Sequence, residues 1–244
     1  MASSSSSADD TNEGTNDVFR DRHSGHRFVM PMDNPTARAI LAQGIYEWPL
    51  IQWCQQFLAP GKVFVDIGAH MGTYSIHLAP FCREVHSFEA QRSTYYNLCA
   101  GIALNNRSNI VAHHVALGNT EDDGQTLTLH KVSADGGGST MEKAFSEKAR
   151  EQKGEEKVTV HCLDHYHLRN VGFLKLDVEG WELNVLQGAV RTLEENGWPK
   201  FIFEVWPDAW YREHKEKLFT FVKGLGYKII PISGYTNMYL AARD

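Results

Sequence analysis

Short apolar runs recur along the middle of the chain, and segments with helix-like apolar spacing lie between them. The run at 63–67 reads Val-Phe-Val-Asp-Ile and is followed at once by glycines, which is typical of a buried parallel strand and the turn after it. Similar runs predict further strands over 84–88, 109–114, 173–177 and 201–205. Two alternating β-rich segments, at 126–131 and 158–162, predict extra strands.

Helical patterns separate these strands along the chain. Helices are predicted over about 73–79, 93–104, 182–195 and 208–223. A charged, helix-like stretch is also expected up to about 153, after a glycine-rich loop. Strands that alternate with helices form βαβ units, so we expect a parallel sheet.

The last two strands, at 227–232 and 238–242, have no room for a helix between them, and the turn signal Ser233-Gly234 separates them. They must form a hairpin, which places an antiparallel strand in the sheet. The expected fold class is therefore α/β, with a doubly wound, mostly parallel, seven-stranded sheet and a C-terminal antiparallel hairpin. This hairpin distinguishes the class I methyltransferase version of the fold from the dinucleotide-binding version. The ligand should lie beyond the carboxyl ends of the strands.

The chain divides into three predicted regions. Residues 1–17 are rich in Ser, Asp, Asn and Gly and cannot bury enough apolar surface to offset their ordering entropy, so a disordered tail is expected. Residues 18–60 contain partly helix-spaced apolar positions and are expected to form a helical lead-in. Residues 61–244 are predicted to form the α/β domain itself.

Composition narrows the classes of function. The 244 residues suit one α/β domain, and the 42% hydrophobic content is ample for its core. The formal charge of −6 disfavours a broad grip on a nucleic-acid backbone. The four cysteines form no C-x-x-C pair, so they predict neither a zinc site nor a disulfide framework. No apolar run approaches a membrane span and no signal peptide opens the chain, so we expect a cytoplasmic protein without membrane association.

Two motifs in consecutive βα units indicate a nucleoside ligand. The first, Asp66-x-Gly68-x-x-x-Gly72, allows a tight turn and a close approach of the ligand to the backbone. The second is Glu89, which ends the next strand 23 positions after Asp66 and can accept hydrogen bonds from both hydroxyls of a ribose. Each motif alone also fits an ordinary turn or a solvated acid. Together they fit either S-adenosylmethionine or NAD.

The third group of residues is the stretch Lys175-Leu-Asp177-Val-Glu179-Gly-Trp-Glu182 at the end of a core strand. Lys175 and Asp177 share one face of that strand, because side chains repeat every second residue. A structural ion pair would explain both residues. The position favours a functional role, because strand ends carry the active site in this architecture.

These motifs resemble the FkbM family of methyltransferases. The resemblance covers roughly residues 44–243 and rests on Tyr46-Glu47, the run 65–72, Phe88-Glu89, Ala116-Leu117-Gly118, the run 174–182 and Phe203-Glu204-Val205. It implies a class I, S-adenosylmethionine-dependent enzyme, and several similar proteins methylate sugar hydroxyls. The cofactor-binding residues that it implies are Glu47, Asp66, Gly68, His70, Gly72, Glu89, Ala116 and Leu117. Two positions depart from the family pattern, since His70 stands where Asn is common and Ala90 where Pro is usual.

Methylation of a hydroxyl group predicts a proton acceptor at the end of the strand that carries Asp177. Asp177, oriented by Lys175, can take the proton as a base. Alternatively, Asp177 with Glu179 and Glu204 can hold Mg²⁺ or Mn²⁺, which prefer oxygen ligands and favour the alkoxide. His114 is a further catalytic candidate, although a core-edge histidine is the simpler interpretation. The expected acceptor is a small molecule or glycan.

Three other functions remain open on the sequence. An NAD-dependent oxidoreductase would explain the glycine loop and Glu89, but not the terminal hairpin or the Lys175–Glu182 stretch. An RNA methyltransferase predicts a basic groove with interleaved aromatic residues, which the acidic balance disfavours. A non-catalytic interaction module with the same fold is the third alternative.

Overall fold

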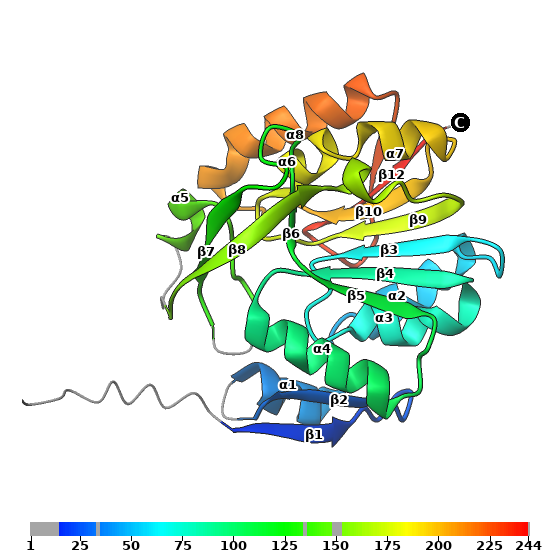
Figure 1. Cartoon of the computed structure of the whole chain (residues 1–244), viewed down its shortest axis with the longest axis vertical. Coiled ribbons are helices and arrows are strands. Elements are labelled where there is room, and N and C mark those ends of the chain that lie inside the picture. The colour runs from blue at the N-terminus through cyan, green and yellow to red at the C-terminus, as the bar shows by residue number, and fades with distance from the viewer. Residues whose placement is uncertain (1–14, 33–34, 134–135, 148–152, 244) are drawn as a thin grey trace, which may run out of the picture.

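A seven-stranded sheet forms the centre of the computed structural model, which describes residues 15–32, 35–133, 136–147 and 153–243 (Figure 1). The strand order is β11-β12-β10-β9-β3-β4-β5. The strands are β3 (Val63–Ile67), β4 (Glu84–Glu89), β5 (Ile110–His114), β9 (Val171–Leu176), β10 (Lys200–Glu204), β11 (Lys228–Pro231) and β12 (Met238–Ala242). Only β12 runs antiparallel to its neighbours, because the other pairings are parallel. The predicted α/β sheet with a C-terminal hairpin is therefore confirmed.

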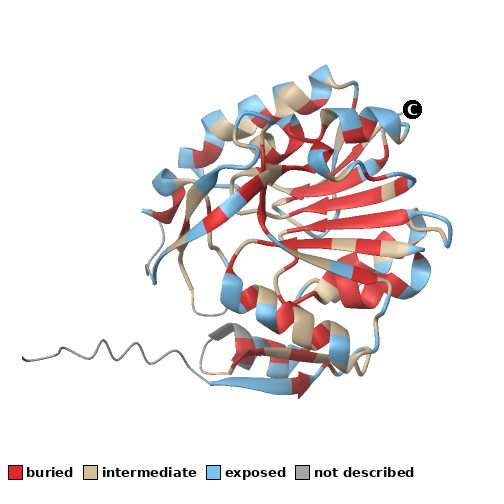
Figure 2. Cartoon of the chain, in the orientation of Figure 1, coloured by how far each residue is buried: buried red, intermediate tan, exposed pale blue. Residues whose placement is uncertain are grey.

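Helices cover both faces of the sheet and create two apolar cores (Figure 2). One core lies under α6 (Glu182–Gln187), α7 (Val190–Glu195) and α8 (Arg212–Gly224). The other lies under α1 (Pro35–Gln43), α2 (Trp48–Cys54) and α3 (Thr73–Leu78). Strand β3 serves both cores, since Val65 packs into the first and Phe64 into the second. This double burial explains why the core strands are nearly continuous apolar runs.

The N-terminal region differs from the prediction. Residues 18–31 are not helical, because β1 (Asn16–Arg20) and β2 (Arg27–Pro31) form an antiparallel hairpin. Phe28 and Met30 alternate with half-exposed neighbours and are fully buried, and β2 packs against α4 (Arg92–Leu104). Strand β1 also begins inside the predicted tail, of which residues 1–14 lie outside the described part of the chain.

The predicted helix over 182–195 is two helices, α6 and α7, separated at Gly188 and Ala189. Asp164 causes this division, because its backbone N–H donates to the carbonyl of Gly188 and its carboxylate accepts the N–H groups of Arg191 and Thr192. A capped second helix thus begins where the pattern suggested continuity.

The remaining elements are short. A second sheet has the order β6-β8-β7 and consists of β6 (Ala116–Gly118), β7 (Thr126–Lys131) and β8 (Gly154–Cys162). The charged stretch before β8 forms only α5 (Lys143–Ser146), and residues 148–152 are not described. The 3-10 turns are η1 (Gln55–Phe57), η2 (Ala79–Phe81), η3 (Leu163–Tyr166) and η4 (Ala209–Tyr211). Within the described ranges, no helix has the length and apolar character needed to cross a membrane.

The packing of β2 predicts that the N-terminal hairpin is part of the cooperative fold. Phe28→Ala removes a fully buried ring that stacks on Phe19 and His77, so we expect a loss of about 3–5 kcal/mol and a melting temperature lower by roughly 6–20 °C. Val18→Ala is the control, because Val18 is 50% exposed on the same hairpin. Equal melting temperatures for both variants in differential scanning calorimetry would contradict this packing.

Candidate active site

The main cavity opens at the carboxyl ends of β3, β4 and β9, where the architecture places ligands. Its empty volume is about 1200 Å³ including the open mouth. The lining combines an apolar set with a polar set. The apolar set includes Phe88, Val115, Ala116, Leu117, Leu129 and Met141. The polar set includes Glu47, His70, Tyr74, Glu89, Lys175, Asp177 and Glu179.

The glycine loop after β3 is held close to the end of β9. Gly68 has a φ of +74°, and a Cβ at this position would lie 1.8 Å from the carbonyl oxygen of Asp177. No residue other than glycine fits there without moving the backbone. The N–H groups of Gly68 and Ala69 both donate to the carbonyl of Phe88, at 3.0 and 2.9 Å, which ties the loop to β4.

His70 occupies a left-handed backbone position in the same loop, with a φ of +52°. Asn and His are both enriched in this conformation among non-glycine residues, so the replacement of the family's Asn preserves the turn. The N–H of His70 donates to Oε2 of Glu89 at 2.9 Å. The departure from the family pattern therefore leaves the loop geometry intact.

Glu89 ends β4 on the cavity wall. Its Oε1 accepts the N–H of Gln91 at 2.9 Å, while Oε2 accepts that of His70. Burial raises the pKa of this carboxyl, although His70 and the two backbone donors oppose the shift. Because each carboxylate oxygen can accept two hydrogen bonds, one acceptor position per oxygen remains for a ligand.

Asp66 does not line the cavity, contrary to the expectation that it contacts the cofactor. It is fully buried behind the glycine loop, where Oδ2 accepts the N–H and the hydroxyl of Ser75, at 3.1 and 2.5 Å. Burial raises the pKa of Asp66, and Lys175 opposes that shift. Gly72 also lies outside the lining and serves as the N-cap of α3, with a φ of +89°. Both residues lie where they position the glycine loop.

Lys175 is the charged residue that joins these parts. Its Nζ donates to the carbonyl of Gly68 at 2.7 Å and lies 3.4 Å from Oδ2 of Asp177 and 3.7 Å from Oδ1 of Asp66. Burial alone would lower the pKa of the ammonium group, but Asp177, Asp66 and Glu47 outweigh burial and raise it. The predicted Lys175–Asp177 pairing is thus observed, and it extends to β3.

The carboxylates of Asp177, Glu179 and Glu204 converge as the sequence predicted. One oxygen from each lies within 4.8 Å of the other two. Burial, together with the neighbouring carboxylates, raises the pKa of Glu179 to about 8 and that of Glu204 to about 10. Such a group of partly buried, neighbouring acids gains stability from protons or from a divalent cation.

Glu182, the third carboxylate of the Lys175–Glu182 stretch, has a structural role. Its Oε1 accepts the N–H groups of Val178 and Gly180, at 3.1 and 3.3 Å, and its Oε2 accepts the hydroxyl of Tyr211 at 3.3 Å. Burial raises the pKa of Glu182 to about 7. These bonds hold the turn that presents Asp177 and Glu179 to the cavity.

Two aromatic residues of the cavity were missed by the sequence analysis. Tyr74 donates its hydroxyl to Oε2 of Glu47 at 2.8 Å, and its ring lies 5.3 Å from Nζ of Lys175. Burial raises the pKa of Glu47, a shift that this hydrogen bond opposes. The indole Nε1 of Trp181 is buried and has no hydrogen-bond partner in the described part of the chain. Trp181 lies within the Lys175–Glu182 stretch, and Tyr74 follows the glycine loop, but the sequence analysis assigned neither side chain a role.

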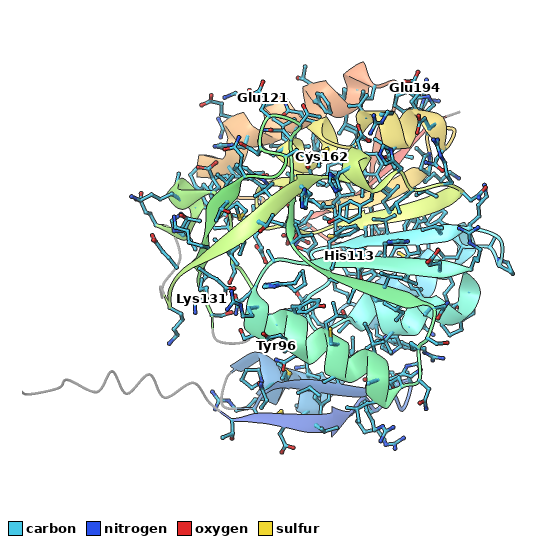
Figure 3. All side chains as sticks on the ribbon, in the orientation of Figure 1. Tyr96, His113, Glu121, Lys131, Cys162 and Glu194 are labelled. Atoms are coloured by element: carbon cyan, nitrogen blue, oxygen red, sulfur yellow. The ribbon has the colours of Figure 1, made fainter. Side chains whose placement is uncertain are left out.

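His114 is not brought to the cavity. It ends β5 at the sheet edge, where its ring stacks on Tyr95 at 5.0 Å and lies 3.9 Å from Glu156. His113 points to the opposite face and stacks on Phe88 at 4.5 Å (Figure 3). Ala116 and Leu117 line the cavity as expected.

Protonation of Glu179 predicts an unusual dependence of stability on pH. A carboxyl with a raised folded-state pKa binds more protons in the folded than in the unfolded chain. The free energy of unfolding therefore falls as pH rises from 4.5, the ordinary pKa of a glutamate, to about 8, the raised pKa of Glu179. Glu179→Gln keeps the acceptor for the Gly138 N–H and removes this titration. In a chelating buffer, its melting temperature should exceed that of the native chain by at least about 2 °C at pH 8, and by less at pH 5.

The matched control for this series is Glu216→Gln, which changes an exposed acid on α8. We expect that variant to follow the native chain at every pH. A Glu179→Gln advantage that is constant from pH 5 to pH 9 would show that Glu179 does not titrate in this range.

Known methyltransferases are similar to the chain in sequence and in fold. The methyltransferase FkbM domain matches residues 66–229 of the chain. The search of curated proteins finds no match. Among solved structures, the chain is similar to methyltransferase FkbM from Methylobacillus flagellatus KT, at 19% identity and a TM-score of 0.50. The alignment covers 76% of this chain and 44% of that one, so the present chain spans less than half of that relative.

Two further solved structures share the fold at lower identity. A precorrin-6y C5,15-methyltransferase from Geobacter metallireducens GS-15 is 12% identical, with coverage of 82% of this chain and 90% of that chain and a TM-score of 0.50. An rRNA methylase from Streptococcus thermophilus is 11% identical, with coverage of 80% and 94% and a TM-score of 0.49. At 12% identity, the likeness to the precorrin methyltransferase shows only a shared fold. The likeness to the rRNA methylase, at a TM-score of 0.49, says nothing about the acceptor of the present chain.

Proposed function

The chain belongs to the FkbM methyltransferase family, and from that premise we propose that it transfers a methyl group from S-adenosylmethionine to a hydroxyl group of a small molecule or glycan. The observation that carries the proposal is the presence of Glu89 and of the Asp177–Glu179 pair in one cavity. Glu89 suits a ribose, and the acid pair suits a hydroxyl group that must lose a proton.

The donor end of the cavity fits S-adenosylmethionine on three counts. The two open acceptor positions of Glu89 match the two ribose hydroxyls. The apolar walls around Leu117 and Met141 suit an adenine ring, and the buried N–H of Trp181 offers it a donor. Gly68 lines the cavity, so its backbone allows a close approach of the amino-acid part of the molecule. When bound, S-adenosylmethionine supplies the methyl group that is transferred.

The acceptor hydroxyl group is activated by Asp177 in this proposal. The proton passes from the hydroxyl oxygen to the Asp177 carboxylate as that oxygen bonds to the methyl carbon and the sulfur–carbon bond breaks. Lys175 orients Asp177 and compensates its charge at 3.4 Å.

A divalent cation fits the same acid cluster. Asp177, Glu179 and Glu204 offer hard oxygen ligands within 4.8 Å of one another, which suits Mg²⁺ or Mn²⁺. A cation held there would acidify the acceptor hydroxyl group. Binding would displace the protons that burial favours on Glu179 and Glu204, so metal affinity should rise with pH.

The other activities have distinct signatures. Calorimetric binding of NAD in preference to adenosylhomocysteine would indicate an oxidoreductase. Labelling of RNA by methyl-labelled S-adenosylmethionine, with no labelling of glycans or small hydroxyl compounds, would indicate an RNA methyltransferase. Binding of adenosylhomocysteine with no turnover on either class would favour an interaction module.

The ribose assignment predicts a loss of cofactor affinity in Glu89→Ala. Because the partner hydroxyls lose their acceptors, adenosylhomocysteine should bind more weakly by about 1–3 kcal/mol in isothermal titration calorimetry. Glu84→Ala is the matched control, since Glu84 begins the same strand, far from the cavity. Unchanged affinity in a folded Glu89→Ala variant would refute the assignment.

The assignment of Asp177 predicts a loss of turnover without loss of cofactor binding. Asp177→Asn keeps the size of the side chain and removes its charge, so kcat should fall by about 10²–10⁴-fold on a screened acceptor. Asp208→Asn, which alters an exposed carboxylate, should leave kcat unchanged. Full activity in Asp177→Asn would reject both mechanisms. Chelation separates them, because only the metal-dependent mechanism loses activity and regains it with Mg²⁺ or Mn²⁺.

A further inference from the structure

A second group of metal-ligating side chains lies outside the main cavity, where β8 meets η3. His161 comes from β8, His165 from η3, and Asp123 from the loop between β6 and β7. One ligand atom from each residue lies within 4.8 Å of the other two, and none of the three lines the main cavity. Glu121 and Cys162, both labelled in Figure 3, mark the two segments that meet here.

The distances are close to the spacing of ligands around a metal ion. Nδ1 of His161 lies 3.0 Å from Oδ1 of Asp123, within hydrogen-bonding distance, and Nδ1 of His165 lies 3.4 Å from Oδ2 of the same carboxylate. In a tetrahedral zinc site with bonds of about 2.0–2.2 Å, neighbouring ligand atoms are about 3.3–3.6 Å apart. The three side chains can therefore reach one ion by rotating, without a movement of the backbone.

Surrounding contacts hold the three side chains in place. The N–H of Cys162 donates to Oδ1 of Asp123 at 3.0 Å, the same oxygen that faces His161. Tyr166 packs edge-on against the His165 ring at 5.4 Å. The side chains of His161, Asp123 and His165 are 26%, 32% and 49% exposed, so an ion can enter and keep water ligands.

The two imidazole rings stack, with centroids 4.3 Å apart and an interplanar angle of 26°. An ion bound to an imidazole nitrogen lies in the plane of that ring, so one ring must rotate before both can bind the same ion. The side chain of His165 is 49% exposed, which leaves room for this rotation.

We propose that Asp123, His161 and His165 form a binding site for Zn²⁺ or a similar borderline transition-metal ion, separate from the acid cluster of the main cavity. Two imidazoles with one carboxylate favour Zn²⁺, Ni²⁺ or Cu²⁺ over Mg²⁺ and Ca²⁺, which prefer oxygen ligands alone. The ion joins the β6–β7 loop to η3, whose Asp164 caps α7. Its binding stabilises the folded chain by mass action.

The test measures Zn²⁺ binding to the full chain, without a histidine tag, by isothermal titration calorimetry and by thermal melting. The native chain should bind one Zn²⁺ and melt at a higher temperature with it, and excess Mg²⁺ should not compete. His161→Gln and His165→Gln should each weaken Zn²⁺ binding by at least about 10-fold. Because His165 is half-exposed, its variant should fold with an unchanged melting temperature when metal is absent.

The matched control is His130→Gln, which alters a histidine on β7 that is 13% exposed and paired with a single acid, Glu155, at 3.3 Å. It should bind Zn²⁺ like the native chain. Three results would overturn the proposal: no saturable Zn²⁺ binding by the native chain, unchanged affinity in both His161→Gln and His165→Gln, or an equal loss in His130→Gln. In the first case, hydrogen bonds from two neutral imidazoles to Asp123 would account for the cluster.

Discussion

The buried ammonium group of Lys175 is the interaction on which the site depends. It lies between Asp66 of β3 and Asp177 at the end of β9, and it donates to the carbonyl of Gly68. Each carboxylate alone would be costly to bury, and so would the lysine. Together they offset one another, and the same contact fixes the glycine loop relative to the acid cluster. The two ends of the cavity therefore keep one geometry through a single side chain.

The sheet could be predicted because each core strand has its own local apolar pattern in the sequence. Elements that are stabilised by residues far away in the sequence could not be predicted in this way. The terminal hairpin followed from the missing helix between its strands. Strand β2, in contrast, is stabilised from α4, where Asn105 accepts the N–H of Arg27 at 2.9 Å. The break between α6 and α7 likewise depends on Asp164, which is 28 positions before Thr192. No window of sequence around either element contains these contacts.

The same reasoning explains which site residues could be found. Asp177 and Glu179 follow β9, and Glu204 is the last residue of the adjacent strand β10. Because the carboxyl ends of parallel strands meet at one edge of the sheet, the sequence could predict that these three acids lie close together. The position of Asp66 in its motif does not show how deeply its side chain is buried. In the structure it lies behind the glycine loop and does not line the cavity. Motif position also does not reveal which face a side chain takes at a sheet edge, and the structure places His114 at the edge, where the simpler interpretation put it. Trp181 lies in the motif that was expected at the site and Tyr74 just after the glycine loop, but the motifs alone do not show which of their side chains face the cavity.

The balance of charge in the cavity bears on which carboxylate takes the proton in the proposed reaction. Several buried acids surround one ammonium group, and a fully ionised cluster would oppose the formation of an alkoxide. The raised pKa values of Glu179 and Glu204 limit that effect, because protons or a cation neutralise these acids near neutral pH. Asp177 differs from them in its contact with Lys175, at 3.4 Å, which orients its carboxylate. Asp177 also lines the cavity, so it is the carboxylate to which we assign the proton of a hydroxyl group bound there.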